Sequence, residues 1–381
     1  MSDRYNAFLF RDETVTGGEG SLAGMTVGVK ANIAVKNMPI HAGIGSWRDR
    51  IADEDAGVVK ALREAGAAIT GILNMEEGAL GAKTDNPHFG PVHNPHRHGF
   101  SPGGSSGGSG AAVAGGLCDI ALGSDTMGSV RIPAAHCGVY GFKPATARVS
   151  QQGLEPADLS LDAIGPLARD LDVLERAARV MSDFGEEAIE GVGATLAGHG
   201  VEIDREVLRV FAKLVHDMDA EPEVESLSHP CSRIRFAGFI GVSKAMAAHL
   251  EGVAVSDHLA KLLTYGPKRS AADWEEDRAI LARTRDEVRG IVAKHGFVLL
   301  PTVPNPPFPH ANREPAAQAD FTCLANIAGL PALSLPAGWT EDGLPIGVQI
   351  VGPEGAEAGL FALARKFDQQ MGAYRAPPEG A

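Results

Sequence analysis

The sequence lacks several features that mark common classes of protein. Its 381 residues include only four cysteines, and no two of them form a C-x-x-C pair, which argues against a zinc site or a disulfide framework. We expect all four (Cys118, Cys137, Cys231 and Cys323) to be free, buried thiols in a reducing cytoplasm, because an unpaired cysteine behaves as a small hydrophobic residue.

Runs of positive charge and long apolar segments are also missing. The formal net charge is −14, and no cluster of lysine and arginine offers the phosphate neutralisation on which nucleic-acid binding depends. The N-terminal residues MSDRYNAFLFRDE have no secretory-signal pattern, and no apolar stretch approaches the roughly 20 residues of a membrane-spanning helix. We therefore predict a cytoplasmic protein with no nucleic-acid or membrane partner.

Short apolar strands alternate with amphipathic helices along the chain. Residues 25–29 alternate in a β-rich pattern that ends at Lys30, residues 55–65 have helical apolar spacing, and residues 67–73 form the next apolar run. This strand, helix, strand order favours an α/β architecture with helices on both faces of the sheet. We predict one large α/β/α domain with a mixed central sheet over residues 1–381.

The second half of the chain continues the pattern. Apolar spacing predicts a helix over residues 165–181 and a charged helix over residues 270–295, which Ser270 caps and Gly296 ends. The segments FVLLPT, PALSLPAG and PIGVQIVG predict strands, AEAGLFALARKFDQQM predicts a helix, and the proline-rich TVPNPPFPH predicts an irregular loop.

A stretch rich in glycine and serine, residues 102–148, does not fit this pattern. Seven glycines precede Leu117 there, and packing alone does not explain them because each glycine costs conformational entropy when it is ordered. Ser105 and Ser129 each lie in a tight glycine turn, 24 positions apart. A helix and a strand between them would bring both hydroxyls back to one place.

This stretch resembles the signature of the amidase signature family of serine hydrolases. The resemblance places Ser105, in GGSSGG, on the family's bridging serine and Ser129, in MGSVR, on its nucleophile; Lys30, in TVGVKANI, falls on its lysine. Two further segments resemble the family, LNMEEGALGAKTDNPHFGPVHNP before the serine loop and FTCLANIAGLPALSLPAGWTEDGLPIGVQIVGP near the C-terminus.

The resemblance implies a Ser-Ser-Lys relay that hydrolyses amides through an acyl-enzyme. Neutral Lys30 would accept the proton of Ser129 through Ser105 and return it to the departing amine. A lysine has a reference pKa of about 10.4, so burial has to lower the pKa of Lys30 before its amine can be free at neutral pH. The resemblance also implies a cis peptide between Gly104 and Ser105, and a reaction that needs no metal and no cofactor.

The turn before the nucleophile is expected to bind the oxyanion. The resemblance implies that the backbone N–H groups of Thr126, Met127, Gly128 and Ser129 point at the developing charge. The family's usual Gly-Gly-Ser is Met-Gly-Ser here. Methionine keeps its N–H, but its side chain is expected to reshape the acyl pocket, and a positive φ at this position would be costly.

Two charged residues flank the nucleophile. The sequence leaves two roles open for Asp125 and Arg131. They could form a buried ion pair that braces the turn, or the arginine could hold a carboxylate of the substrate.

Three other interpretations of these motifs are weaker. The string GGSSG satisfies the G-x-S-x-G nucleophile elbow, which would make Ser105 the nucleophile, but Pro102 stands where that motif needs a strand. A phosphate-binding loop would need G-K-[ST] after the glycines. The histidines of HFGPVHNPHRHGF could bind a metal, although the surrounding prolines and glycines favour a turn-rich loop.

We predict an amidohydrolase that releases ammonia or an amine from a linear, small or polar amide, with that small molecule as its only partner apart from a possible second copy of the chain. The alternatives are a carbamoyl-type amidase and the glutaminase subunit of a tRNA amidotransferase. The resemblance covers residues of about 70–180 and 297–371, whereas the middle segment at 182–249 is shortened. That short middle argues against a partner-docking surface, and we expect it to line the acyl pocket together with the loop near Pro304.

Overall fold

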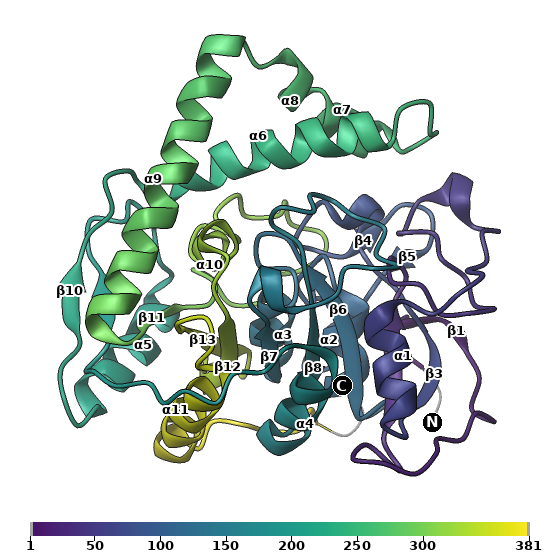
Figure 1. Cartoon of the computed structure of the whole chain (residues 1–381), viewed down its shortest axis with the longest axis horizontal. Coiled ribbons are helices and arrows are strands. Elements are labelled where there is room, and N and C mark those ends of the chain that lie inside the picture. The colour runs from purple at the N-terminus through teal and green to yellow at the C-terminus, as the bar shows by residue number, and fades with distance from the viewer. Residues whose placement is uncertain (1–2, 379–381) are drawn as a thin grey trace.

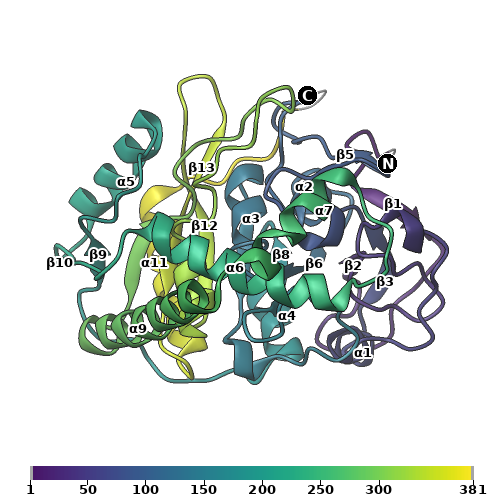
Figure 2. The ribbon, with the colours of Figure 1, turned by 90° about the horizontal axis from the view of Figure 1, so that it is seen from above.

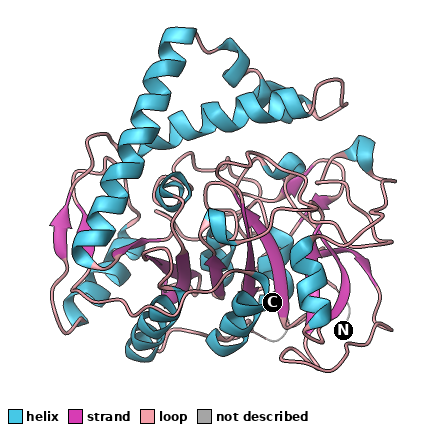
Figure 3. Ribbon diagram, in the orientation of Figure 1, coloured by secondary structure: helices cyan, strands magenta, loops and turns pink. Residues whose placement is uncertain are grey.

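One sheet of 11 strands forms the centre of the molecule, with helices on both faces (Figures 1 and 3). The structure is a computed structural model that describes residues 3–378. The strands of this sheet are β1 (Phe8–Arg11), β2 (Thr26–Lys30), β3 (Ala68–Leu73), β6 (Ile120–Asp125), β7 (Tyr140–Lys143), β8 (Ala163–Ala168), β9 (Ala194–Leu196), β10 (Glu223–Glu225), β11 (Val298–Pro301), β12 (Ala332–Trp339) and β13 (Pro345–Val351). They lie in the order β1-β3-β2-β6-β8-β7-β12-β13-β11-β9-β10. A separate short pair is formed by β4 (Asp85–Asn86) and β5 (Gly90–Pro91).

Helices fill the connections between these strands. They are α1 (Gly57–Glu64), α2 (Gly107–Ala114), α3 (Arg131–Cys137), α4 (Leu171–Met181), α5 (Arg205–Asp217), α6 (Cys231–His249), α7 (Asp257–Leu263), α8 (Tyr265–Lys268), α9 (Ala271–His295), α10 (Cys323–Ala328) and α11 (Glu357–Met371). The predicted α/β/α architecture is confirmed. Within residues 3–378, no helix combines the length and the apolar character needed to cross a membrane.

The sheet is mixed, and its parallel part determines where the functional residues meet. β2 pairs in parallel with β3 and with β6, while β6, β8, β7, β12 and β13 pair antiparallel in turn. Parallel neighbours need a crossover, which α1 provides between β2 and β3. Because β2 and β6 run in the same direction, their last residues, Lys30 and Asp125, reach the same edge of the sheet.

The small-residue run of the signature forms α2, which is buried along its whole length. Its sequence, GGSGAAVA, contains no side chain larger than valine. Small side chains let a helix approach its neighbours closely, so α2 packs directly against the sheet and against α3. The abundance of glycine and alanine in this segment is therefore a packing requirement.

The helix predicted over residues 165–181 is wrong in its first part. Ala163–Ala168 is the buried strand β8, and the helix α4 begins only at Leu171. Pro166 lies inside the strand, and a proline in a helix interior would remove a hydrogen bond and clash with the preceding turn. Asp170 then caps α4, since its side chain accepts hydrogen bonds from two N–H groups of the first turn. The predictions of β2, α1, β3, α9 and the C-terminal strands and helix are confirmed.

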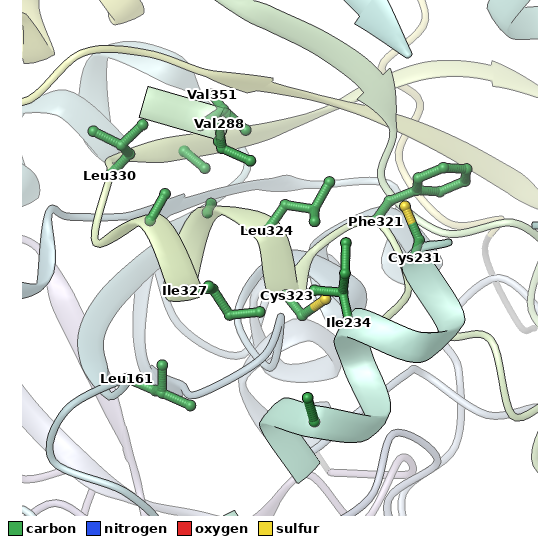
Figure 4. Packing of buried hydrophobic residues seen from close by; sticks show 14 of the residues in the cluster. Leu161, Cys231, Ile234, Val288, Phe321, Cys323, Leu324, Ile327, Leu330 and Val351 are labelled. Atoms are coloured by element: carbon green, nitrogen blue, oxygen red, sulfur yellow. The ribbon is translucent and has the colours of Figure 1, made fainter. Parts of the chain in front are cut away.

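The helices α6 to α9, residues 231–295, form an arm that extends over the sheet (Figures 1 and 2). The arm is anchored through α10, whose apolar side chains pack between α6, α9 and the sheet (Figure 4). Buried residues of this cluster include Cys231, Ile234, Val288, Cys323, Leu324 and Ile327. The four cysteines of the chain are free and buried, as predicted.

Candidate active site

Lys30 is completely buried at the end of β2. Its Nζ lies 2.7 Å from Ser105 Oγ and 2.9 Å from Ser124 Oγ. Burial lowers the pKa of Lys30 to about 7, although neighbouring carboxylates, Asp162 first among them, raise it. Because the ammonium form loses its hydration on burial, a large fraction of Lys30 is the free amine at neutral pH.

Ser105 lies in the loop that leads into α2 and has no exposed surface. The peptide between Gly104 and Ser105 is cis, which confirms this part of the prediction. The Ser105 carbonyl accepts a hydrogen bond of 3.0 Å from Glu76 N–H, which fixes the loop against the chain that follows β3. The hydroxyl of Ser105 is thereby held beside Lys30.

Ser129 lies on the turn between β6 and α3, next to the serine loop. Its carbonyl accepts a hydrogen bond of 3.3 Å from Ser106 N–H. Ser129 keeps 9% of its surface exposed, whereas Ser105 has none. In the part of the chain that the structure describes, the two hydroxyls make no hydrogen bond with each other. The structure thus brings Lys30, Ser105 and Ser129 to one place, and of the two serines only Ser129 keeps any exposed surface.

Not all four backbone N–H groups of residues 126–129 that were predicted to bind the oxyanion are free to do so. Gly128 N–H donates to Asp125 Oδ1 at 2.7 Å, so this predicted oxyanion donor already has an acceptor. The N–H groups of Thr126, Met127 and Ser129 have no acceptor among residues 3–378. They are the donors that remain for an oxyanion.

Gly128 has to be glycine for two reasons. Its φ is +132°, a conformation that other residues rarely adopt. A Cβ at this position would also lie 2.1 Å from Thr322 Oγ1, which donates a hydrogen bond of 2.7 Å to the Met127 carbonyl. The contact with Thr322 therefore fixes the turn before the nucleophile.

Met127, where the resemblance leads us to expect glycine, is accommodated without backbone strain. Its φ is not positive, so the cost anticipated from the sequence does not arise. A Cβ built on Gly238 of α6 would lie 3.1 Å from Met127 Cε, which shows that the methionine side chain reaches the arm. Met127 is also packed against the cluster that contains Ile327. The side chain forms a wall between the nucleophile turn and α6.

We expect the substitution Met127→Ala to widen the range of accepted acyl groups. Removing the side chain opens space beside α6 while the backbone N–H stays in place, and one methylene in an apolar pocket changes kcat/KM by about 10-fold or more. For straight-chain primary amides, kcat/KM should therefore rise about 10-fold for the longer acyl chains and change little for acetamide. Met127→Leu, which conserves the volume, is the control. A uniform loss for all chain lengths in Met127→Ala would contradict the role of a wall.

Asp125 and Arg131 form a buried brace behind the nucleophile turn. Arg131 binds Asp125 through two nitrogens, each at 3.0 Å, and gives its other donors to Gln349 and Asn326 at 2.7 Å. Both charged side chains have no exposed surface. Burial would raise the pKa of Asp125, but the guanidinium lowers it to about 2. Of the two roles left open by the sequence, the buried ion pair is the one that the structure shows.

Several polar residues beside Lys30 escaped the sequence analysis. Ser124 Oγ lies between Lys30 Nζ and Asn32 Nδ2, which donates to it at 3.0 Å. Asp162 accepts hydrogen bonds from the Thr126 hydroxyl and from two backbone N–H groups, and burial raises its pKa to about 6. The spacing of Asn32, two residues after the lysine, was an available signal; nothing in the local sequence points to Asp162.

The histidines do not take part in this arrangement. His136 is buried on α3, where burial lowers its pKa to about 4, and its Nε2 is 3.2 Å from the Asn305 carbonyl, away from Ser129. In the loop after β5, His93 stacks on His98 with ring centroids 3.8 Å apart. Among residues 3–378, no three His, Cys, Asp or Glu side chains converge in a way that could hold a metal ion.

The arm contributes an ion pair that the sequence analysis also missed. Arg235 of α6 binds Asp320 through its Nε, and no residue within 3–378 accepts from its two terminal nitrogens. The Arg235 side chain is 25% exposed, whereas that of Asp320 is 3% exposed. Arg235 lies one helical turn before Gly238, which contacts Met127. Arg235 and Gly238 therefore share one face of α6, the face that contacts Met127. The carboxyl group of Glu314 lies within electrostatic reach of Arg235.

Comparison with known proteins yields consistent matches over nearly the whole chain. A family model described as Amidase matches residues 10–188 and 241–361. The A subunit of the glutamyl-tRNA(Gln) amidotransferase of Methanothermobacter thermautotrophicus is 33% identical over 91% of this chain and 85% of its own length, and that of Thermus thermophilus gives the same values.

Solved structures give the same result. The A subunit of the Thermotoga maritima glutamyl-tRNA(Gln) amidotransferase superposes with a TM-score of 0.86 at 29% identity over 99% of this chain and 91% of its own. A chain from a vestigial protein complex that bears on the evolutionary origins of an s-triazine catabolic enzyme has a TM-score of 0.88 at 28% identity over 98% and 92% of the two chains. A further crystal structure, described only as amidase, has a TM-score of 0.86 at 30% identity over 96% and 92%.

These matches overturn the predicted set of partners. We predicted a chain that takes a small-molecule amide alone or as a homodimer, with no link to nucleic acid. The similar curated proteins are the A subunits of an enzyme that acts on glutamyl-tRNA, so they are parts of a larger assembly. The error came from taking the shortened middle segment as evidence against a docking surface, whereas its residues 231–249 form the helix α6 of the arm.

Proposed function

This chain belongs to the amidase signature family, whose members are hydrolases acting on carbon–nitrogen bonds, and from that premise we propose that it cleaves a primary carboxamide through an acyl-enzyme on Ser129. The observation that carries the proposal is the buried amine of Lys30, 2.7 Å from the Ser105 hydroxyl and with a pKa lowered to about 7 by its burial. A neutral amine in that place can act as a general base at physiological pH.

The proposed reaction uses the three residues in sequence. Ser129 Oγ attacks the amide carbon while its proton passes to Ser105 Oγ, and the Ser105 proton passes to Lys30 Nζ. Closing this relay requires the Ser129 hydroxyl to turn toward Ser105. The tetrahedral oxygen accepts hydrogen bonds from the free N–H groups of Thr126, Met127 and Ser129. Lys30 then returns the proton through Ser105 to the nitrogen, which leaves as ammonia, and water hydrolyses the ester by the same route.

The substrate class that we propose is an amino acid with a side-chain carboxamide, glutamine in the first place. The free nitrogens of Arg235 are suited to the α-carboxylate and the Asp320 carboxylate to the α-ammonium, because opposite charges in a partly buried site interact strongly. The curated relatives are named as A subunits of an amidotransferase, an enzyme class that transfers an amide nitrogen. We therefore extend the proposal to an ammonia-releasing subunit of an amidotransferase, one of the two alternatives that the sequence left open.

Arg235→Ala tests the proposed substrate. With glutamine we expect kcat/KM to fall about 100-fold, mainly through KM, because the charged end loses its partner while the reacting amide keeps its own contacts. Butyramide, which has the carboxamide without either charge, should be cleaved as by the unchanged enzyme. Ammonia release measured with both substrates separates the effects, and Arg235→Lys is the conservative control. Equal losses with both amides would contradict a role in binding the charged end.

A second function is favoured by the likeness to the chain from the vestigial complex that bears on the origins of an s-triazine catabolic enzyme. A carbamoyl compound such as a carboxybiuret presents an amide flanked by nitrogen, and the wall formed by Met127 would suit a short, flat acyl group. Ammonia release from carbamoyl compounds and from glutamine, compared at equal concentrations, decides between the two.

A further inference from the structure

The arm contains an open groove at the point where α6, α8 and α9 meet. Its volume is about 430 Å³, and it is lined by Phe236, Ile240, Lys261, Thr264, Tyr265, Lys268, Arg269 and Asp273. The one acidic side chain of this lining, Asp273, lies 3.8 Å from Arg269, so the three basic side chains leave the groove with a net positive charge. The helix α8 is held close to α6, because a Cβ on Gly266 of α8 would lie 2.4 Å from Lys244 N. In Figure 1 the α8 end of the arm stands clear of the sheet.

Two of the cations in the groove have no partner. Arg269 is bound by Asp277 through bonds of 2.7 and 3.1 Å. Lys261 and Lys268 are exposed, and the side chain of neither forms an ion pair or a hydrogen bond with any residue between 3 and 378. Their charges are therefore available to an anionic ligand.

Aromatic rings lie beside these lysines. Tyr265 is 43% exposed, and its ring meets that of Phe239 edge to face at 5.6 Å. The Phe236 ring is held under the Arg269 guanidinium at 5.4 Å. Exposed rings in fixed positions are typical anchors for an apolar side chain of a partner, since little entropy is lost when they bind.

The groove and the active site lie on different faces of α6. With about 100° per residue, Phe236 and Ile240 project on one side of the helix, and Arg235 and Gly238 project on the other. Gly238 is the residue that contacts Met127. Changes in the groove should therefore leave amide hydrolysis intact.

We propose that this groove binds an acidic segment of a partner polypeptide, with carboxylates on Lys261 and Lys268 and an apolar or aromatic side chain against Tyr265. Basic side chains outnumber acidic ones between residues 231 and 295, although the whole chain carries −14. Acidic side chains that lie more than one Debye length, about 10 Å, from the groove have little effect on a short segment bound there, because salt screens their charges. A nucleic-acid strand that needed many phosphate contacts would run past the acidic body of the molecule and be repelled.

The test is a selection of dodecapeptides displayed on phage against the full chain, followed by anisotropy measurements on the selected peptides after labelling. We expect acidic sequences with one or two aromatic or leucine residues, and a Kd at least 10-fold weaker for the Lys261→Glu/Lys268→Glu variant. The matched control, Lys60→Glu/Lys366→Glu, changes the net charge equally on the surface of the body and should bind as the unchanged chain. Tyr265→Ala should also weaken binding.

The outcomes separate this proposal from the proposed reaction. If the groove variant releases ammonia as the unchanged chain does but no longer binds the peptides, the groove is a peptide-binding site that acts independently of the proposed reaction. Selected peptides that are basic, or that bind the groove variant equally well, overturn it, as does a selection that yields no binding peptide. A random 20-nucleotide RNA pool is tested in parallel. RNA that binds the unchanged chain but not the groove variant would overturn the peptide proposal in favour of a nucleic-acid site.

Discussion

Ser129→Ala is expected to lower kcat/KM for a primary amide by at least about 10⁴-fold. The alanine removes the hydroxyl of the proposed nucleophile, which is the one of the two serines that keeps exposed surface, and loss of the nucleophile in a serine hydrolase leaves only the contribution of binding and of the oxyanion donors. The measurement is ammonia release from the best substrate. The fold should be retained, because the substitution removes one oxygen atom from a residue whose carbonyl, not its hydroxyl, makes the contact with Ser106.

Ser105→Ala is the matched comparison, because it separates the relay from the nucleophile elbow. In the relay both variants are nearly inactive, but only the enzyme with an intact Ser129 can be labelled by a fluorophosphonate. Mass spectrometry of the labelled chain should therefore place the adduct on Ser129. An adduct on Ser105, or near-normal turnover by Ser129→Ala, would support the elbow and reject the role that we assign to Ser129.

The sequence was sufficient to predict that Lys30, Ser105 and Ser129 come together, whereas the roles proposed for them came from the family resemblance. Lys30 follows a regular strand, and Ser105 and Ser129 stand in glycine turns separated by one helix and one strand, so their convergence follows from the order of these elements. The cis peptide at Gly104 followed from the resemblance alone. In each case the signal lies within a few neighbouring residues.

The features that escaped prediction depend on contacts between distant segments. Gly128 N–H turns to Asp125 because that carboxylate is held by Arg131 and Asn326, a residue about 200 positions away in the chain. Arg235 meets Asp320 only because the arm folds back over the sheet. No local pattern carries such information. The error at β8 is of another kind, because Pro166 inside the strand and Asp170 at the start of α4 were local signals that the extended apolar spacing overrode.

Titration of Lys30 should also be visible in stability. Its pKa in the folded chain is lowered from the ordinary value of 10.5 to about 7. Between these two values the unfolded chain binds the proton more than the folded chain does, so this residue's unfavourable contribution to folding is largest below pH 7 and is relieved as the pH rises from 7 toward 10.5. At pH 6 we therefore expect Lys30→Met to have a Tm at least equal to that of the unchanged chain.

The same titration determines the acidic limb of the pH–rate profile. The free amine of Lys30 is the active form, so kcat/KM should rise with pH, with an apparent pKa of about 7, and reach a plateau near pH 8. Lys30→Met should lose about 10⁴-fold at every pH. Three other buried groups could give a limb near this pH, because burial raises the pKa of Glu76 to about 8 and of Asp162 to about 6 and lowers the pKa of Lys143 to about 7. Glu76→Gln, Asp162→Asn and Lys143→Met are therefore the controls. A limb that persists in all three belongs to the amine of Lys30, whereas a limb that disappears in one of them would transfer the titration to that group and remove Lys30 from the role of base.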